Sequence, residues 1–214
     1  MEPGTGKTIV VFGASGVIGR HVVDEAVRAG YRVRAFTRDA SKIPARDGVE
    51  PIQGDALDPD AVARAIQGSH AVISALGPTT NRKEEVEKSV TAIRNIVRAM
   101  DRWGVRRLVG LSGAAVQIAG ERKPLGGRIA SFIVRLLAGN VVRAKQREYE
   151  ETAATTLDWT VVRPPRVVDR PAAGRAIASD RLHSRSISES DLAAFMVSEV
   201  DAAEHVREAP FVSG

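Results

Sequence analysis

The stretch TIVVFGASGVIG, residues 8–19, decides the fold. Its apolar beginning, Thr8–Phe12, is typical of a short buried strand, and the pattern from Val17 to Ala29 predicts a helix that Gly30 ends. Between strand and helix lie glycines at a regular spacing of three residues: Gly13, Gly16 and Gly19. This order of strand, glycine turn and helix predicts a βαβ unit whose turn can receive a dinucleotide.

A second glycine-rich motif, residues 4–8, comes just before the strand and has the Gly-Lys-Thr ending of a Walker phosphate loop. That loop requires a glycine five positions before the glycine that precedes lysine, and Met1 stands at that position. The motif also precedes a strand, so no helix follows to direct its N-terminus at a triphosphate. The later turn is therefore favoured: Gly13 makes the tight turn, Gly16 lets a pyrophosphate approach, and Gly19 brings helix against sheet.

Strands and helices continue to alternate along the rest of the chain. Strands are predicted at 31–37, 49–54, 70–76, 106–112, 158–164 and 209–214, and helices at 58–67, 83–103, 141–154 and 186–200. Asp58 is the expected cap of the first of these helices, and Ser188 with Asp191 forms a capping box for the last. The alternation predicts an α/β fold, a Rossmann-type doubly wound parallel sheet with helices on both faces, as a single domain over residues 1–214.

Two stretches depart from this rhythm and are predicted to carry substrate-loop elements, at about 113–140 and 164–190. Within the first, apolar residues recur at helical spacing and predict a core-facing helix: Ile129, Phe132, Ile133, Leu136 and Leu137. Ligands of such folds bind at the carboxyl ends of the strands.

The chain carries 31 Lys and Arg against 26 Asp and Glu, a net charge of +5. The basic residues are scattered and aromatic residues are only 4% of the chain, so no base-stacking surface for nucleic acid is predicted. A positive cleft that attracts a phosphorylated cofactor accounts for the same surplus of positive charge.

Composition also bears on location and on the available chemistry. No apolar run approaches the length of a membrane span, and no basic flank followed by an apolar stretch opens the chain, so we expect a cytoplasmic protein without membrane contact. The chain has no cysteine, which excludes disulfides and thiolate chemistry. The histidines lack metal-like spacing, and no metal site is predicted for His21, His70, His183 or His205.

The turn VVFGASGVIG resembles that of the atypical short-chain dehydrogenases/reductases. The resemblance continues along nearly the whole chain, through Gly54-Asp55, SALG at 74–77, Ser112 and the segment AKQREYEETAATTLDWTVVRPPRV at 144–167. The segment SRSISESDLAAFM at 184–196 is similar to the C-terminal part of flavin reductases of the biliverdin reductase B type. The chain also resembles the nitrogen-metabolite-repression proteins, which bind NADP and act as regulators without turnover.

The resemblance implies that the chain binds NADP(H). The matching positions are Gly13, Ser15, Gly16, Val17, Ile18, Gly19, Thr37, Arg38, Asp55, Ala56, Ala75, Leu76, Gly77, Lys145 and Pro164. Proteins that prefer NAD usually have an acid at the end of the second strand, where this chain has Thr37 and Arg38. Arg38 either binds the 2′-phosphate through charge-assisted bonds or is a solvated arginine beside Asp39. Asp55 either matches the residue that contacts adenine or belongs to a plain turn.

The best-known reductases of this superfamily use a tyrosine four residues before a lysine as proton donor. Here Val141 stands four residues before Lys145, and Tyr149 lies four residues after it on the same helical face, as a packing residue or a donor. The resemblance implies direct hydride transfer to a conjugated acceptor, with water as proton source. Ser112 and Lys145 are then the catalytic residues. Ser112 would hold the substrate or the nicotinamide, and Lys145 would hold the nicotinamide ribose.

The alternatives at these two positions are structural. Ser112 is otherwise a strand-end hydroxyl bonded to backbone, and Lys145 a solvated helical lysine. One departure from the flavin reductases is Arg166, which stands where they have a histidine after two prolines. A cation there can still face an acidic substrate.

The sequence thus predicts an NADPH-dependent reductase of a flavin, quinone or similar planar conjugated small molecule, acting as a monomer or weak dimer. The alternative is a regulator that senses NADP(H) without turnover, which the missing tyrosine favours. Reduction or isomerisation of a substrate carbonyl, with Tyr149 or water supplying the proton, is a third hypothesis.

Overall fold

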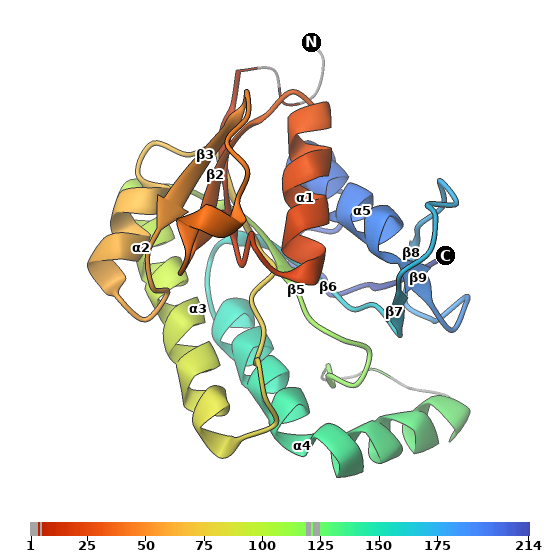
Figure 1. Ribbon diagram of the computed structural model, residues 1–214. Helices are drawn as coiled ribbons and strands as arrows, with labels where there is room; N and C mark the ends of the chain where they lie inside the picture. The colour runs from red at the N-terminus through yellow and green to blue at the C-terminus, as the bar shows by residue number, and fades with distance from the viewer. Residues whose placement is uncertain (1–3, 5, 119–120, 122–124) are drawn as a thin grey trace.

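Six parallel strands form the central sheet, in the order β3-β2-β1-β4-β5-β6 (Figure 1). The computed structural model describes residues 4, 6–118, 121 and 125–214, without the side chains of 125–137. The strands are β1 (Thr8–Phe12), β2 (Arg32–Thr37), β3 (Val49–Gln53), β4 (Ala71–Ser74), β5 (Arg107–Leu111) and β6 (Asp158–Val162). The chain reverses its direction of winding between β1 and β4, which confirms the predicted Rossmann-type doubly wound sheet.

Helices cover both faces of this sheet. On one face α1 (Val17–Arg28) packs beside α5 (Glu189–Ala202), and on the other lie α2 (Pro59–Ile66), α3 (Lys83–Trp103) and α4 (Leu125–Ala153) (Figure 1). In β1, Ile9 and Val11 belong to the apolar core on the α1 side, and Val10 and Phe12 to the core on the α2 side. Because both faces of the strand are buried, its sequence is a continuous apolar run.

Side-chain caps set where helices begin. Asp58 accepts bonds from the first backbone N–H groups of α2, and the Ser188 Oγ accepts one from the Asp191 backbone N at 3.0 Å, as predicted. The Asp191 carboxylate also accepts bonds at 2.9 Å from the backbone N–H groups of Ala173 and Gly174. The start of α5 therefore holds the preceding loop in place.

Helix α4 consists of two segments that meet at Ala138, whose backbone (φ −134°, ψ 41°) is not helical. The second segment agrees with the helix predicted at 141–154, and the first provides the helical backbone expected from the apolar spacing at 129–137. The predicted orientation of Ile129, Phe132, Ile133, Leu136 and Leu137 toward the core lies outside the described side chains.

Short strands close the C-terminal part of the molecule. β7 (Val167–Val168) pairs with β9 (Ile187–Ser188), and β8 (Ile177–Ser179) pairs with β10 (Phe211–Ser213). The last helix therefore begins at Glu189 and not at 186, because the two residues before it pair with β7. Across the described chain, no helix combines the length and apolar character that crossing a membrane requires.

Candidate functional site

Gly13 and Gly16 lie in the turn between β1 and α1, at the carboxyl end of the sheet, and Gly19 is in the first turn of α1. Gly13 has a φ of +76°, a conformation in which other residues are strained, and a Cβ on Gly19 would lie 2.0 Å from the Gly13 carbonyl oxygen. A Cβ on Gly16 would meet only that oxygen, at 3.2 Å, among the described atoms. Gly13 and Gly19 are thus required by the turn itself, whereas Gly16 keeps the space above the turn open.

The N-terminus of α1 follows directly. No described side chain caps it, and its first turn contains no acidic residue. Val17, the first residue of the helix, is 55% exposed. Unbonded N–H groups and a partial positive charge at a solvent-facing helix N-terminus are the features that bind a phosphate.

The other glycine motif lies at the opposite end of β1. The Gly4 backbone N donates to the Asp201 Oδ2 at 3.2 Å, and the Lys7 Nζ donates to its Oδ1 at 2.7 Å. Burial alone would raise the pKa of Asp201, but the bonds from Lys7, Tyr31 and His70 outweigh it and lower that pKa to about 2. Lys7 is therefore part of an ion pair that supports the fold, which agrees with the rejection of a Walker loop.

Thr37 ends β2 beside the glycine turn, and Arg38 follows it. Thr37 is buried, and its Oγ1 lies 2.9 Å from the Ser15 Oγ. Arg38 is exposed, and its guanidinium has no bonded or ion-paired partner in the described part of the chain. Asp39 instead accepts a bond from the Ser41 Oγ at 2.6 Å, which lowers the pKa of Asp39. Arg38 is thus a cation at the carboxyl edge that is not paired with Asp39.

Asp55 and Ala56 follow β3. The Asp55 Oδ1 accepts a bond from the Leu57 backbone N at 2.9 Å, as in the plain turn that the sequence left open. The Ala56 carbonyl oxygen accepts a bond from the Asn95 Nδ2 at 3.0 Å and is held inside the protein. The exposed carboxylate of Asp55 stays a predicted contact for adenine.

Lys145 reaches from α4 to segment 75–77, which follows β4. Its Nζ donates to the carbonyl oxygens of Leu76 and Leu111, at 2.5 and 2.9 Å, and to the Glu148 Oε2 at 2.8 Å. An ammonium has three N–H donors, so this geometry uses all of them. Lys145 is therefore not a solvated helical lysine. Its predicted contact with a nicotinamide ribose requires one of the three bonds to be exchanged.

Ser112 follows β5, and its Oγ is buried without a hydrogen-bond partner among the described residues. The hydroxyl is thus not bonded to backbone, contrary to the structural alternative. It lines a cavity of about 20 Å³ together with Lys145, Glu148 and Tyr149. Sequence reasoning missed Glu148, although its position three residues after Lys145 on one helical face was a usable signal.

Tyr149 packs its ring edge-on against Trp159, with centroids 6.0 Å apart, which fits the packing alternative. Val141, at the position of the family's tyrosine, offers an apolar side chain, and its backbone N donates to the Asn81 Oδ1 at 3.3 Å. The position expected to carry a phenolic proton donor therefore carries an apolar side chain that cannot donate a proton.

The segment after β6 contains Pro164, a predicted cofactor contact. Pro164 is buried, and its carbonyl oxygen accepts a bond from the Ala114 backbone N at 3.0 Å. The neighbouring Arg163 donates to both carboxylate oxygens of Glu121, each at 3.0 Å. Such paired bonds hold the segment after β5 against the end of β6. Arg166, three residues further along, is exposed.

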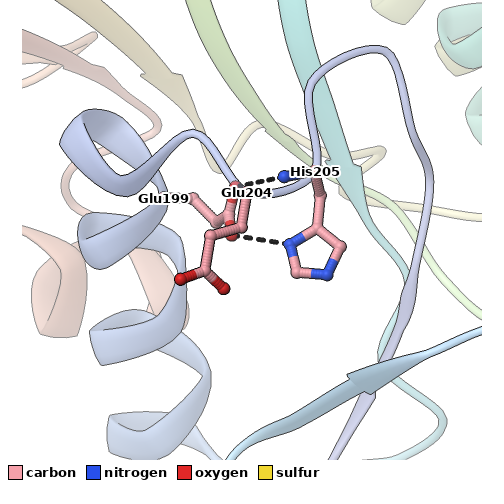
Figure 2. A group of neighbouring side chains, drawn as sticks. All are labelled: Glu199, Glu204 and His205. Atoms are coloured by element: carbon pink, nitrogen blue, oxygen red, sulfur yellow. Dashed lines mark hydrogen bonds and ion pairs between the residues drawn. The ribbon is translucent and has the colours of Figure 1, made fainter.

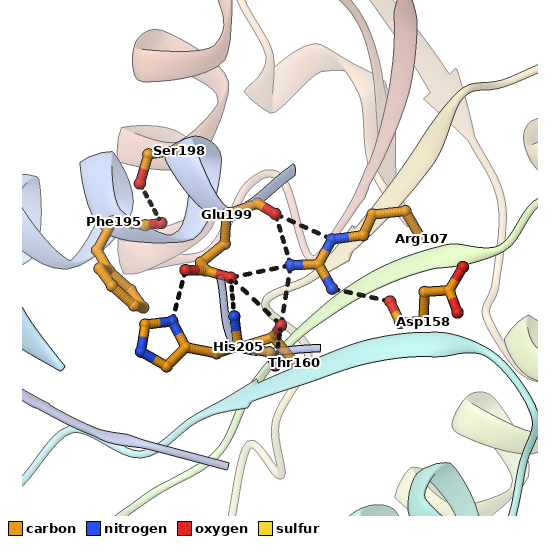
Figure 3. A network of polar contacts seen from close by, with 7 residues as sticks. All are labelled: Arg107, Asp158, Thr160, Phe195, Ser198, Glu199 and His205. Carbon is orange, nitrogen blue, oxygen red and sulfur yellow. Dashed lines mark hydrogen bonds and ion pairs between the residues drawn. The ribbon is translucent and has the colours of Figure 1, made fainter. Parts of the chain in front are cut away.

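A separate polar network lies at the amino end of the sheet (Figure 3). Arg107, the first residue of β5, donates to the carbonyl oxygen and the carboxylate of Glu199, and the His205 Nδ1 lies 2.7 Å from the other carboxylate oxygen (Figure 2). Glu199, Glu204 and His205 are close enough to share a metal ion. Because both oxygens of Glu199 already have protein partners, we assign this cluster a structural role.

Comparison with known proteins places the chain in a family. Residues 13–203 match the family described as NAD(P)H-binding. The chain is 31% identical over 123 residues to the 3 beta-hydroxysteroid dehydrogenase/Delta 5-->4-isomerase of Mycobacterium tuberculosis, covering 53% of this chain and 33% of that protein. It is 32% identical over 158 residues to the (4-alkanoyl-5-oxo-2,5-dihydrofuran-3-yl)methyl phosphate reductase of Streptomyces griseus, covering 73% and 46%. The matched region thus spans less than half the length of either relative.

Solved structures share the fold over nearly the whole chain. The oxidoreductase ylbE of Lactococcus lactis matches with a TM-score of 0.80 at 18% identity, covering 97% of this chain and 90% of that one. ChuY of Escherichia coli O157:H7, described as an anaerobillin reductase, matches with a TM-score of 0.79 at 20% identity, covering 97% of both chains. At such identities the likeness shows the fold alone. The family match over most of the chain confirms what the glycine turn predicted: the chain belongs to the NAD(P)H-binding family of Rossmann-fold proteins.

Proposed function

We propose that the protein is an NADPH-dependent reductase that transfers a hydride to a planar conjugated small molecule such as a flavin or a quinone. The observation that carries the proposal is the carboxyl edge of the sheet, where an open glycine turn, an uncapped helix N-terminus and the unpaired cation of Arg38 occur together. These groups suit a pyrophosphate and a further phosphate. The bound dinucleotide supplies the hydride.

The preference for NADP(H) over NAD(H) rests on the end of β2. An NAD-dependent protein has an acid there for the ribose hydroxyls, whereas this chain has Thr37, whose hydroxyl is bonded to Ser15, and then Arg38. The carboxylate nearest in sequence, Asp39, is bonded within its own turn. A 2′-phosphate would therefore meet a cation that no described carboxylate neutralises.

A conjugated acceptor suits a site without a phenol. Such a ring spreads the negative charge that arrives with the hydride and takes its proton from water, so orientation matters more than an enzyme acid. Ser112, with its unbonded Oγ, would orient the substrate or the nicotinamide. The reductase description of the Streptomyces griseus relative supports reductive chemistry.

A regulator that senses NADP(H) without turnover is the second candidate. The observation that favours it is the Lys145 ammonium, whose donors are all used within the protein. Such a lysine is well suited to holding strand ends and less available to a reacting cofactor.

Steady-state oxidation of NADPH with FMN, riboflavin and a set of quinones separates the two candidates. We expect turnover with at least one acceptor, and faster turnover with NADPH than with NADH. Calorimetric binding of NADP(H) without turnover in the whole panel would favour the regulator. Absence of binding would contradict both candidates.

A further inference from the structure

Lys145 and Glu148 form an ion pair inside the candidate site and not on the surface. The distance from Nζ to Oε2 is 2.8 Å, and the two side chains are 12% and 15% exposed. Charges that are largely removed from water act on their surroundings through a lower effective dielectric constant than exposed charges do. Loss of one charge of the pair would therefore change the electrostatic potential of this region strongly.

The contacts of the pair place it at the ends of β4 and β5. The Lys145 Nζ binds the carbonyl oxygens of Leu76 and Leu111, which follow or end these strands. Both strands lie on the far side of β1 from β2 and β3 in the sheet order. A dinucleotide extends across the switch point of a doubly wound sheet, so this half is the one that receives the nicotinamide nucleotide.

The cavity beside the pair leaves little room for solvent. The Glu148 Oε1 and the Ser112 Oγ are both buried without partners in the described chain, and both residues line the cavity of about 20 Å³. A cavity of that size has space for about one water molecule. Lys145 and Glu148 are the charged members of its described lining. The carboxylate thus balances the ammonium with almost no help from water.

We infer that Glu148 is a positioning residue that neutralises the Lys145 ammonium and thereby sets the preference of the site between oxidised and reduced dinucleotide. The inference rests on the proposed function, because it requires the dinucleotide to bind at this edge of the sheet. The oxidised nicotinamide ring is a cation and the reduced ring is neutral. An ammonium without its carboxylate would therefore repel the oxidised form selectively.

Calorimetric titration of the variant Glu148→Gln with NADP⁺ and with NADPH tests this role. The substitution keeps the shape and one carbonyl acceptor for Lys145 but removes the negative charge. We expect the affinity for NADP⁺, relative to that for NADPH, to fall about three- to tenfold below the ratio of the unmodified protein. The two forms share the same phosphates and riboses, so a general loosening of the site would weaken both equally and leave the ratio unchanged.

Two further variants sharpen the test. Glu150→Gln removes an exposed carboxylate from the same helix and should leave the ratio unchanged. The Glu150 Oε1 accepts a bond from the Gln146 Nε2 at 3.0 Å. Glu148→Asp keeps the charge on a shorter side chain and should keep the ratio near that of the unmodified protein, even where both affinities fall.

Equal weakening of both forms by Glu148→Gln would overturn the inference, as would a shift of the same size in Glu148→Asp. A different failure tests the proposed function. If the unmodified protein binds neither form, the proposed function is wrong and the inference falls with it.

Discussion

The two ends of the central sheet differ in how completely their carboxylates are bonded, although one other buried atom without a partner in the described chain, the Trp159 Nε1, belongs to the amino half of β6. At the amino end, Asp201 and Glu199 accept hydrogen bonds on both carboxylate oxygens. At the carboxyl end, Ser112 and Glu148 each keep a buried atom without a partner in the described chain, and Arg38 is unpaired. A buried polar atom without a partner costs about 1–3 kcal/mol, so these atoms lower stability unless a bound ligand supplies their partners.

We therefore expect stability and dinucleotide binding to depend on opposite ends of the same strands. Substitutions at the amino end should change the free energy of unfolding and leave dinucleotide affinity intact. Substitutions of Gly16 and Arg38 at the carboxyl end should change dinucleotide affinity far more than the free energy of unfolding.

The largest effect is expected from Glu199→Ala at the amino end. It leaves the guanidinium of Arg107, whose side chain is 8% exposed, without its carboxylate, and burial already lowers the pKa of that arginine. We expect the free energy of unfolding, measured by urea denaturation, to fall by about 3–5 kcal/mol. The control Glu204→Ala removes an exposed carboxylate and should change the free energy of unfolding by less than about 0.5 kcal/mol. Loss of dinucleotide binding by folded Glu199→Ala protein would break the separation of the two ends.

Gly16→Val should abolish dinucleotide binding, with a loss in affinity of at least about a hundredfold, because its side chain would occupy the space of the pyrophosphate. Gly16 has a φ of −74°, which any residue can adopt, but its Cβ would lie 3.2 Å from the Gly13 carbonyl oxygen, so the free energy of unfolding should fall by about 1–2 kcal/mol. Lys7→Ala, at the other end of β1, should leave affinity nearly unchanged. Calorimetric titration of both variants decides this, and comparable losses in the two would revive the Walker loop.

Arg38→Ala should weaken NADP binding about tenfold to a hundredfold, the worth of a charge-assisted bond, and leave NAD binding almost unchanged. Arg38 makes no bond or ion pair within the described chain, so its removal should not alter the unfolding midpoint. Titration with both dinucleotides measures the difference. Equal losses for NADP and NAD would mean that Arg38 supports the loop and does not bind the 2′-phosphate.

The smallest effect is expected from Tyr149→Phe, which should keep turnover within about threefold, because the ring packs on Trp159 and a conjugated acceptor needs no phenol. A positioned general acid contributes roughly a hundredfold to ten-thousandfold, so the two outcomes are easily separated in steady-state kinetics. A fall of that size with unchanged cofactor affinity would make Tyr149 the proton donor and place function on a residue now assigned to packing.

Elements with strong local signals were predicted almost residue by residue. β1 and α3 have the predicted bounds, Thr8–Phe12 and Lys83–Trp103, because a buried apolar run and a long helical period need no distant partner to be recognised. The start of α5 was predicted three residues too early. Pairing of β9 with β7 withdraws residues 187–188 from the helix, and that pairing joins segments about twenty residues apart.

The sequence by itself determined the glycine turn and the Thr37-Arg38 end of β2. Both depend on requirements of a single backbone segment: a positive φ, a close helix–strand approach, and an arginine in place of an acid. Only the tertiary structure decided the hydrogen bonding of Lys145 and Ser112. The acceptors Leu76 and Leu111 lie 69 and 34 residues from Lys145 in the chain. The sequence therefore cannot show that all N–H donors of the Lys145 ammonium are used, because the acceptors come close only when β4 and β5 pack against α4. Hydrogen bonding depends on which groups are adjacent in space, and in this fold the assembled sheet, not the neighbouring sequence, makes them adjacent.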